Sequence, residues 1–355
     1  MSQPDVLPYG SWPSPITANL IASKTLRVLE PTLVGEDTYW IEVRSSEEGR
    51  YVLVRRSPDG TTADVIPEGF SARTRVHEYG GGAYAVDGEI IFFSNWDDQR
   101  LYRRDPGEDP YPITLDRDLR YADGVVDRRR NRLICVQEDH AVDGEAVNTI
   151  VSVDLDGQED SRILVSGNDF YAAPRLDPDG SRLAWLTWTH PNMPWNGTEL
   201  WVAELAPDGS LTSRALVAGS PDESIFQPQW SPDGVLHFVS DRTNWWNLYR
   251  FMDGDVEPLT ALEAEFGQPQ WVFRMSTYDF ASADRIICSY TKDGTWHLAS
   301  LDPQTRGLTP LAVPYTEISN LRAAPDRAVF RGGSPTEPRS IVQLDLDIGT
   351  TEVLR

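Results

Sequence analysis

The chain has 355 residues, of which 55 are acidic and 32 basic, giving a formal net charge of −23 at pH 7. Such a charge repels a nucleic-acid backbone and an anionic membrane surface, so neither is expected as a partner. The first residues lack the basic and apolar regions of a signal peptide, and no apolar run could span a bilayer, so we expect a cytoplasmic protein.

The N-terminal segment differs from everything that follows it. Prolines stand at positions 4, 8, 13 and 15, and the segment lies outside the repeating pattern of the rest of the chain. Proline fixes its own backbone angle and has no amide hydrogen to donate. We therefore expect residues 1–24 to form an extended segment.

A repeated unit fills residues 25–355. Each unit has an Asp-containing turn between two apolar strands, then a variable loop, a third strand and a weaker fourth strand. Four strands per unit at a period of roughly 40 to 54 residues is typical of β-propellers. We predict an all-β, seven-bladed β-propeller of four-stranded antiparallel blades, with turn aspartates at Asp37, Asp87, Asp127, Asp179, Asp233, Asp284 and Asp326.

The loops of such a propeller emerge on two opposite faces. The tight turns, rich in Pro-Asp-Gly, join strands one and two or strands three and four, and lie on what we call the first face. The second face carries the loops between strands two and three, the loops between blades, and both ends of the propeller. Its loops are rich in aromatic residues, which indicates a contact surface; they span residues 75–83, 94–100, 138–148, 189–198 and 240–247.

The chain lacks the sequence signs of self-contained catalysis. The nearest match to a G-x-S-x-G nucleophile elbow, "GGSPT" at 332–336, ends in Thr336, and no histidine follows His297. The five histidines have no metal-ligand spacing, the "YGGGAY" run has the wrong spacing for a dinucleotide site, and Cys135 and Cys288 lie in apolar strand patterns. We predict no catalytic residue, no metal and no cofactor.

The long loop motifs, taken in order, carry a family resemblance. The stretches "PYGSWPSPIT", "RTRVHEYGGGAY", "FFSNWDDQRLYR", "WLTWTHPNMPWNGTELW" and "QPQWVFRMSTYDF" resemble the N-terminal half of bacterial acylaminoacyl-peptidase or dipeptidyl-aminopeptidase-like members of the prolyl oligopeptidase family of serine peptidases. The resemblance covers essentially the whole chain. Two positions depart from it, since Thr189 and Asn196 stand where the family tends to have Asp, which puts in doubt an acidic role for that loop.

The resemblance implies a propeller that caps an α/β-hydrolase domain and restricts access to peptides. In that family the catalytic triad lies in the hydrolase domain, so this chain alone is expected to be inactive. The expected partners are the hydrolase domain, normally in the same chain, and a peptide substrate. Residues 1–24 would run along the hydrolase domain.

Candidate site residues come from the second-face loops and one inner strand. Acidic, histidine and arginine side chains there could hold the amine or the carbonyl of a peptide, or could instead brace the loops. The candidates for substrate binding are His77, Glu78, Tyr79, Glu138, Asp139, His140 and Arg274; those for the domain interface are Trp96, His190, Trp195, Trp245 and Trp246.

Two other functions stay open from the sequence. An independent propeller could bind a protein partner through the same tryptophan-rich face. A metal-dependent propeller lactonase or glycosidase would need carboxylates that converge in the central channel, and the predicted inner strands offer few.

Overall fold

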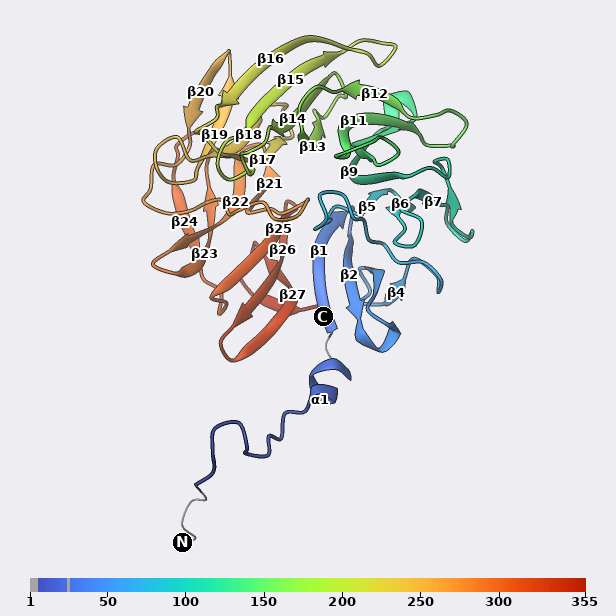
Figure 1. Cartoon of the computed structure of the whole chain (residues 1–355). Helices are drawn as coiled ribbons and strands as arrows, with labels where there is room; N and C mark the ends of the chain where they lie inside the picture. Colours follow the sequence, from blue (N-terminus) through green and yellow to red (C-terminus); the bar gives the residue numbers. More distant parts are fainter. Residues whose placement is uncertain (1–5, 24–25) are drawn as a thin grey trace.

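The computed structural model describes residues 6–23 and 26–355 and shows seven four-stranded antiparallel sheets set radially around a central axis (Figure 1). Each sheet is a blade made of four consecutive strands, and the first strands of neighbouring blades contact one another around the axis. The predicted fold class is therefore confirmed, with strands one to four running from the axis to the rim. Within the described ranges, no helix is long and apolar enough to cross a membrane.

The blades take up the whole of residues 26–353. Three short helices accompany them: α1 (Ala18–Ser23), η1 (Ser45–Glu47) and η2 (Arg128–Arg130). Blades 1 to 4 consist of β1 (Leu26–Val34), β2 (Asp37–Arg44), β3 (Arg50–Arg56), β4 (Thr62–Asp64), β5 (Tyr84–Asp87), β6 (Ile90–Ser94), β7 (Leu101–Arg104), β8 (Tyr111–Pro112), β9 (Leu119–Asp127), β10 (Arg132–Asp139), β11 (Val147–Asp154), β12 (Arg162–Val165), β13 (Phe170–Leu176), β14 (Arg182–Trp188), β15 (Glu199–Leu205) and β16 (Leu211–Gly219). Blades 5 to 7 consist of β17 (Ile225–Trp230), β18 (Leu236–Ser240), β19 (Asn247–Met252), β20 (Asp255–Pro258), β21 (Tyr278–Ser282), β22 (Arg285–Lys292), β23 (Thr295–Leu301), β24 (Leu308–Leu311), β25 (Glu317–Ala323), β26 (Arg327–Ser334), β27 (Glu337–Asp345) and β28 (Thr351–Val353).

All seven predicted aspartates lie at the turn between the first and second strands of a blade. The Pro-Asp-Gly turns close in the same way, because the glycine amide donates to the carbonyl three residues earlier. In blade 5 this bond joins Gly234 to Ser231 at 2.9 Å, and Gly234 has a φ of +81°. Glycine adopts a left-handed conformation without steric cost, so the residues of each turn are enough to specify its shape.

The innermost strands share a backbone feature that the sequence did not reveal. In five of them a residue with positive φ stands where the pairing register shifts; in blades 2 and 6 the corresponding residue lies just before the strand. Such bulges bend a strand and redirect its side chains. Near the axis, the left-handed residues are Glu30, Gly82, Asp123, Ala173, Gln227, Arg274 and Asn320.

The hydrophobic core is divided into layers between neighbouring blades. One cluster packs Tyr39 and Ile41 of blade 1 on Tyr84 and Phe93 of blade 2, and others join each successive pair. Aliphatic and aromatic side chains from facing sheets interdigitate in these layers, as in a sandwich. The sheets are therefore held together mainly by apolar contact.

Blade 7 closes on blade 1 through side chains, since each described blade uses only its own four strands. Trp40 and Val52 of blade 1 pack on Val329 and Ile341 of blade 7. An ion pair joins the buried Glu42 to Arg355 at 2.6 Å. A second pair joins Arg56 to the exposed Glu352 at 2.7 Å.

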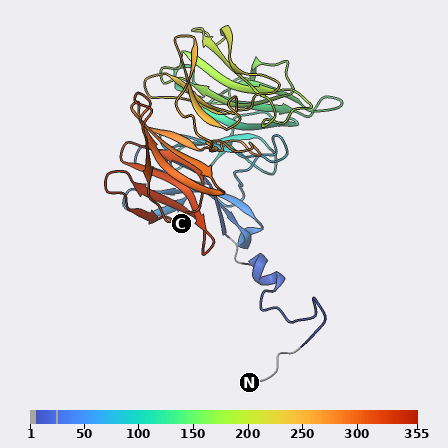
Figure 2. The same cartoon turned by 90° about the vertical axis from the view of Figure 1, so that its left-hand side faces the viewer.

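Both ends of the propeller lie together on the second face. Leu26 pairs with Arg44, and Arg44 and Arg355 both bind the carboxylate of Glu42. Residues 6–23 lead away from the propeller in both views (Figures 1 and 2). We expected an extended segment over residues 1–24, and the structure instead shows a short helix, α1, within it. Residues 1–5 and the predicted boundary at 24–25 lie outside the described residues.

We predict that the buried closing ion pair stabilises the propeller more than the exposed one. Glu42→Gln removes the buried carboxylate that Arg44 and Arg355 share, although Arg44 keeps Glu47 and Asp64 as partners, and should lower the free energy of unfolding by about 2 kcal/mol. Glu352→Gln removes an exposed partner and should cost less than about 1 kcal/mol. Urea unfolding of both variants measures this difference; equal losses would show that closure depends on apolar packing alone.

Candidate functional site

Loops from blades 2 and 6 meet over the axis on the second face, where Figure 1 shows the cyan loop before β5 beside the orange loop before β21. Gly81 forms a parallel bridge with Phe273, and the Phe273 amide donates to the Gly80 carbonyl at 3.0 Å. Blades 2 and 6 stand on opposite sides of a seven-membered ring, so this pairing crosses the central axis. We call residues 80–82 with residues 273–274 the axial brace.

The axial brace requires glycine because other backbone segments lie very close to these residues. A β-carbon on Gly81 would lie 2.7 Å from the Phe273 carbonyl oxygen, and the residue has a φ of +86°. A β-carbon on Gly82 would lie 3.1 Å from the α-carbon of Asp123. The "YGGGAY" run therefore carries the contact across the axis, beyond the local bend that the sequence suggested.

Charged side chains fill the axis beside the brace. Asp123 is buried and accepts the Ala173 amide; its carboxylate lies 2.9 Å from Arg175 and 2.8 Å from Arg274. Burial opposes ionisation of Asp123, but the two guanidinium groups outweigh it and hold its pKa below the usual range. Arg274 also donates to the Gly124 carbonyl, so its guanidinium is engaged within the channel.

Two further carboxylates complete this axial network. Burial raises the pKa of Glu30 to about 7, although Glu30 accepts the Gly82 amide and lies near arginines. Burial likewise raises the pKa of Asp279, against the nearby Arg322. The channel thus holds more carboxylates than the sequence suggested, and of these three only Asp123 has arginine partners that outweigh its burial. Among the described residues no cluster of three or more His, Cys, Asp or Glu side chains is placed to hold a metal.

His77 is a packed ring that supports the loop before β5. It lies 4.7 Å from the Phe273 ring and 5.3 Å from the Phe170 ring, between centroids, with Trp188 on another side. Burial lowers the pKa of His77 to about 4, so the ring is neutral near pH 7. Its backbone amide donates to Glu138 at 2.7 Å, and its φ is +52°.

Glu138 organises the other candidates around it. This carboxylate is buried and accepts both the His77 amide and the ring Nε2 of His140, the latter at 3.1 Å. Arg120 lies 3.8 Å from Glu138 and 3.1 Å from Glu78. The structure thus brings together four predicted residues: His77 and His140 bind Glu138, and Arg120, which sequence reasoning missed, links Glu138 to Glu78. Asp139 accepts the nearby Ala141 amide and caps its own loop.

Three aromatic rings from different blades meet beside this group. Tyr79, on the blade 2 loop, lies 5.5 Å from Trp271 before β21, and Trp271 lies 4.5 Å from Trp195 on the β14–β15 loop. Tyr79 is 64% exposed and Trp271 50% exposed. We call Tyr79, Trp271 and Trp195 the aromatic platform. Trp271 stood inside a motif recognised in the sequence, but nothing local marked it as exposed.

The remaining interface candidates are spread over the face. Trp96 is in contact with the guanidinium groups of Arg73 and Arg75, which lie 3.9 and 4.2 Å from its ring centroid. Trp246 packs on Gly267, whereas its neighbour Trp245 is exposed. His190 is exposed, with its amide bound to Asp169, and its peptide bond to Pro191 is cis.

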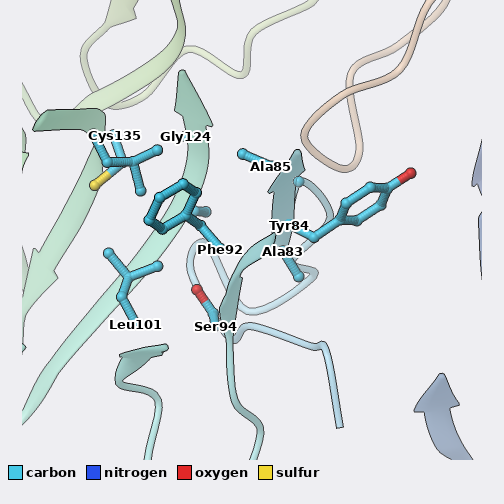
Figure 3. Close-up of a pocket in the computed structure, with 11 residues that line it drawn as sticks. Ala83, Tyr84, Ala85, Phe92, Ser94, Leu101, Gly124 and Cys135 are labelled. Carbon is cyan, nitrogen blue, oxygen red and sulfur yellow. The ribbon is translucent and has the colours of Figure 1, made fainter. Parts of the chain in front are cut away.

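A small apolar pocket between blades 2 and 3 is a packing gap (Figure 3). Phe92, Leu101 and Cys135 line it, and the ring of Tyr84 points away from them (Figure 3). Tyr84 instead donates its hydroxyl to the Glu30 carbonyl. Burial raises the pKa of the Cys135 thiol, which keeps it protonated and unreactive. Both cysteines are free and buried, as their strand patterns indicated.

We predict that the axial brace tolerates no side chain at Gly81. Gly81→Ala should lower the free energy of unfolding by about 2 to 4 kcal/mol, because the methyl group would overlap the Phe273 backbone in addition to straining a left-handed residue. Gly88→Ala is the matched control, since Gly88 is also left-handed but has open space around it; it should cost about 1 kcal/mol. Denaturant midpoints give both losses of stability. Equal losses in the two variants would mean that the backbone of the brace moves to accommodate the methyl group.

Comparison with known proteins finds solved structures that share this architecture. No family model matches the chain, and no curated protein matches it. Among solved structures, a puromycin-hydrolysing peptidase from Mycobacterium tuberculosis is 38% identical, with a TM-score of 0.90 over 98% of this chain and 56% of its own. A puromycin hydrolase in complex with PGG is 35% identical, with a TM-score of 0.91 and the same two coverages.

A more distant match shows the fold alone. A prolyl endopeptidase structure is 13% identical, with a TM-score of 0.70 over 93% of this chain and 49% of its own. The chain spans about half the length of these proteins. The resemblance drawn from the loop motifs is confirmed: over nearly its whole length the chain is similar to the N-terminal, seven-bladed propeller of puromycin-hydrolysing peptidases, and its fold is that of the prolyl oligopeptidase propeller.

Proposed function

We propose that the chain is the substrate-gating propeller of a cytoplasmic serine peptidase, in which an α/β-hydrolase domain hydrolyses peptides. One observation carries this proposal: the chain aligns over 98% of its length with 56% of a puromycin-hydrolysing peptidase at 38% identity. A relationship at that level over a whole propeller supports a shared arrangement. The rest of such a peptidase would supply the catalytic triad.

The second face is the surface that suits the hydrolase domain. Both ends of the propeller lie there beside Glu42, so a domain joined at either end begins on that face. Tryptophans on its loops, including Trp195 and Trp245, are at least partly exposed. Large apolar surfaces of this kind are usually covered by a partner.

The N-terminal segment, residues 1–24, would pack along the same domain. In its described part, Tyr9 is 99% exposed and Trp12 51% exposed, and their rings meet edge to face. Ile16 and Leu20 are exposed as well. Such a run of apolar side chains leading away from the propeller is consistent with burial against a second domain.

The axial brace supports the proposed gating role. Because residues 80–82 pair with Phe273 across the axis, the centre of the second face is filled by backbone and by the rings beneath it. A peptide would then meet the second-face loops before the hydrolase domain. We assign the amine contact to Glu78, whose side chain is 78% exposed, and a supporting role to Glu138, whose oxygens already accept hydrogen bonds.

We predict that the 355-residue chain alone hydrolyses neither peptides nor esters, and that its gene encodes a G-x-S-x-G domain after Arg355. The chain has no nucleophile elbow and no histidine after His297, so the triad must come from elsewhere. The checks are turnover of aminoacyl 4-nitroanilides by the pure chain and the codons that follow Arg355. A stop codon together with an inactive chain would favour an independent binding propeller, and turnover unaffected by Ser334→Ala would contradict the family boundary.

We also predict that Glu78 holds the free amine of the substrate in the complete enzyme. Glu78→Gln should lower kcat/KM for free-amine substrates by roughly tenfold to a hundredfold, since a hydrogen bond to a charged group is worth about 1.5 to 3 kcal/mol. Acetylated substrates should be unaffected.

Glu138→Gln and Asp139→Asn are the comparison variants for this experiment. Loss of the Glu138 carboxylate should loosen the His77 loop and reduce turnover of free-amine and acetylated substrates alike. An equal loss for both substrates in Glu78→Gln would assign Glu78 to bracing through Arg120.

A further inference from the structure

We propose that the central channel of the propeller binds a small tetrahedral oxyanion, such as phosphate or sulfate, between Arg175, Arg274 and Arg322. This site is separate from the second-face loops and does not depend on the proposed peptidase function. The three arginines come from blades 4, 6 and 7. Arg175 and Arg322 are the penultimate residues of β13 and β25, so they lie toward the first face, whereas Arg274 belongs to the axial brace.

One carboxylate serves two of these three guanidinium groups. Nη1 of Arg175 and Nε of Arg274 lie 2.9 and 2.8 Å from the same oxygen, Oδ1 of Asp123. The other oxygen of Asp123 accepts the Ala173 amide at 2.8 Å. With both oxygens engaged, Asp123 has little capacity left for a third cation. Two positive groups therefore share a single negative charge.

Arg322 has no carboxylate of its own among the described residues. Its Nη1 donates to the Leu321 carbonyl at 2.9 Å and its Nη2 to the Arg274 carbonyl at 3.3 Å. The nearby Asp279 is engaged elsewhere, since its Oδ2 accepts the Ala323 amide at 3.0 Å, and burial raises its pKa. A guanidinium has five N–H donors, so about three donors of Arg322 are left for a ligand.

The three guanidinium groups also repel one another. Burial, together with repulsion from Arg274 and Arg322, lowers the pKa of Arg175 to about 10, although Asp123 attracts it. Burial and repulsion from Arg274 likewise lower the pKa of Arg322. Glu30 compensates only in part, because its pKa of about 7 leaves it partly protonated at neutral pH. The axis therefore carries surplus positive charge in a chain whose net charge is −23.

The free donors of this arginine cluster face the channel. The side chains of Arg175 and Arg274 are 20% and 24% exposed, whereas that of Asp123 is 1% exposed. The blades surround these arginines on the outside, and the axial brace covers them toward the second face, so an anion would enter from the first face. Guanidinium groups bind oxyanions through pairs of N–H donors. Three such groups approaching from different blades suit a tetrahedral anion better than a planar carboxylate with two oxygens.

Thermal unfolding of the 355-residue chain in phosphate, sulfate and chloride at equal ionic strength tests the site. With a dissociation constant of about 1 mM, about 10 mM phosphate or sulfate should raise the midpoint by about 2 °C over chloride, because an anion that binds only the folded chain stabilises it. Arg322→Gln should abolish this rise, since it removes the guanidinium that lacks a carboxylate and keeps an amide donor for the backbone carbonyls.

Arg331→Gln is the matched control. Arg331 lies in β26, the next strand of the same blade, and it too forms no ion pair with a described residue, but it stands away from the axis. This variant should keep the full rise. A rise that persists in Arg322→Gln, or no rise in the unmodified chain, would overturn the proposal. An equal rise with acetate would contradict the preference for a tetrahedral anion.

A second measurement does not depend on the stability of any variant. Crystals of the unmodified chain soaked in tungstate, a tetrahedral oxyanion of a heavy metal, should show an anomalous peak within hydrogen-bonding distance of Arg175 and Arg322. Peaks only at other places, or none, would count against the site. Neither measurement involves catalysis, so a negative result would leave the proposed peptidase function untouched.

Discussion

The cross-axis pairing of Gly81 with Phe273 is the contact on which the second face depends. A ring of seven blades leaves its centre to be filled, and here the filling is backbone from two opposite loops. Because one strand-like bridge fixes both loops, it also fixes what they carry: the His77 ring beneath and the Tyr79 and Trp271 rings above. A displacement of either loop would therefore move several functional candidates at once.

The charged side chains at the axis, like the axial brace, join blades on opposite sides of the ring. Asp123 of blade 3 binds Arg274 of blade 6 across the axis and Arg175 of blade 4 beside it. A buried carboxylate with two guanidinium partners is compensated, so it constrains the arrangement of the blades even where its net contribution to stability is small. The same pairing leaves Arg274 with less freedom to bind a substrate carbonyl than the sequence suggested.

Much of the fold could be predicted because its determinants are local. The turn aspartates and the Pro-Asp-Gly turns each specify a hairpin within a few residues, and their repetition gives the number of blades. The aromatic loops were placed on the correct face for the same reason, since strand order alone assigns every loop to a side. A short helix such as α1, without a periodic apolar pattern, gives no comparable signal.

The site was predicted less well because its determinants are tertiary. Nothing near Arg120 shows that it joins Glu78 to Glu138, and nothing near Trp271 shows that Tyr79 and Trp195 will lie against it. The left-handed residues of the inner strands were also missed, because Asp123 and Arg274 are not glycines and only the crowding at the axis holds them there.

Burial decides which of the predicted polar residues remain free to act. His77 and Glu138 were equal candidates with Glu78 and Tyr79 in the sequence, since all lie in second-face loops. In the folded chain the His77 ring is enclosed by three aromatic rings. Both carboxylate oxygens of Glu138 are hydrogen-bonded, one to the His77 amide and the other to the His140 ring. Glu78 and Tyr79, by contrast, keep their side chains in solvent. A carboxylate and an exposed ring therefore stand on adjacent residues of one loop, which the left-handed backbone of His77 and Glu78 holds in place.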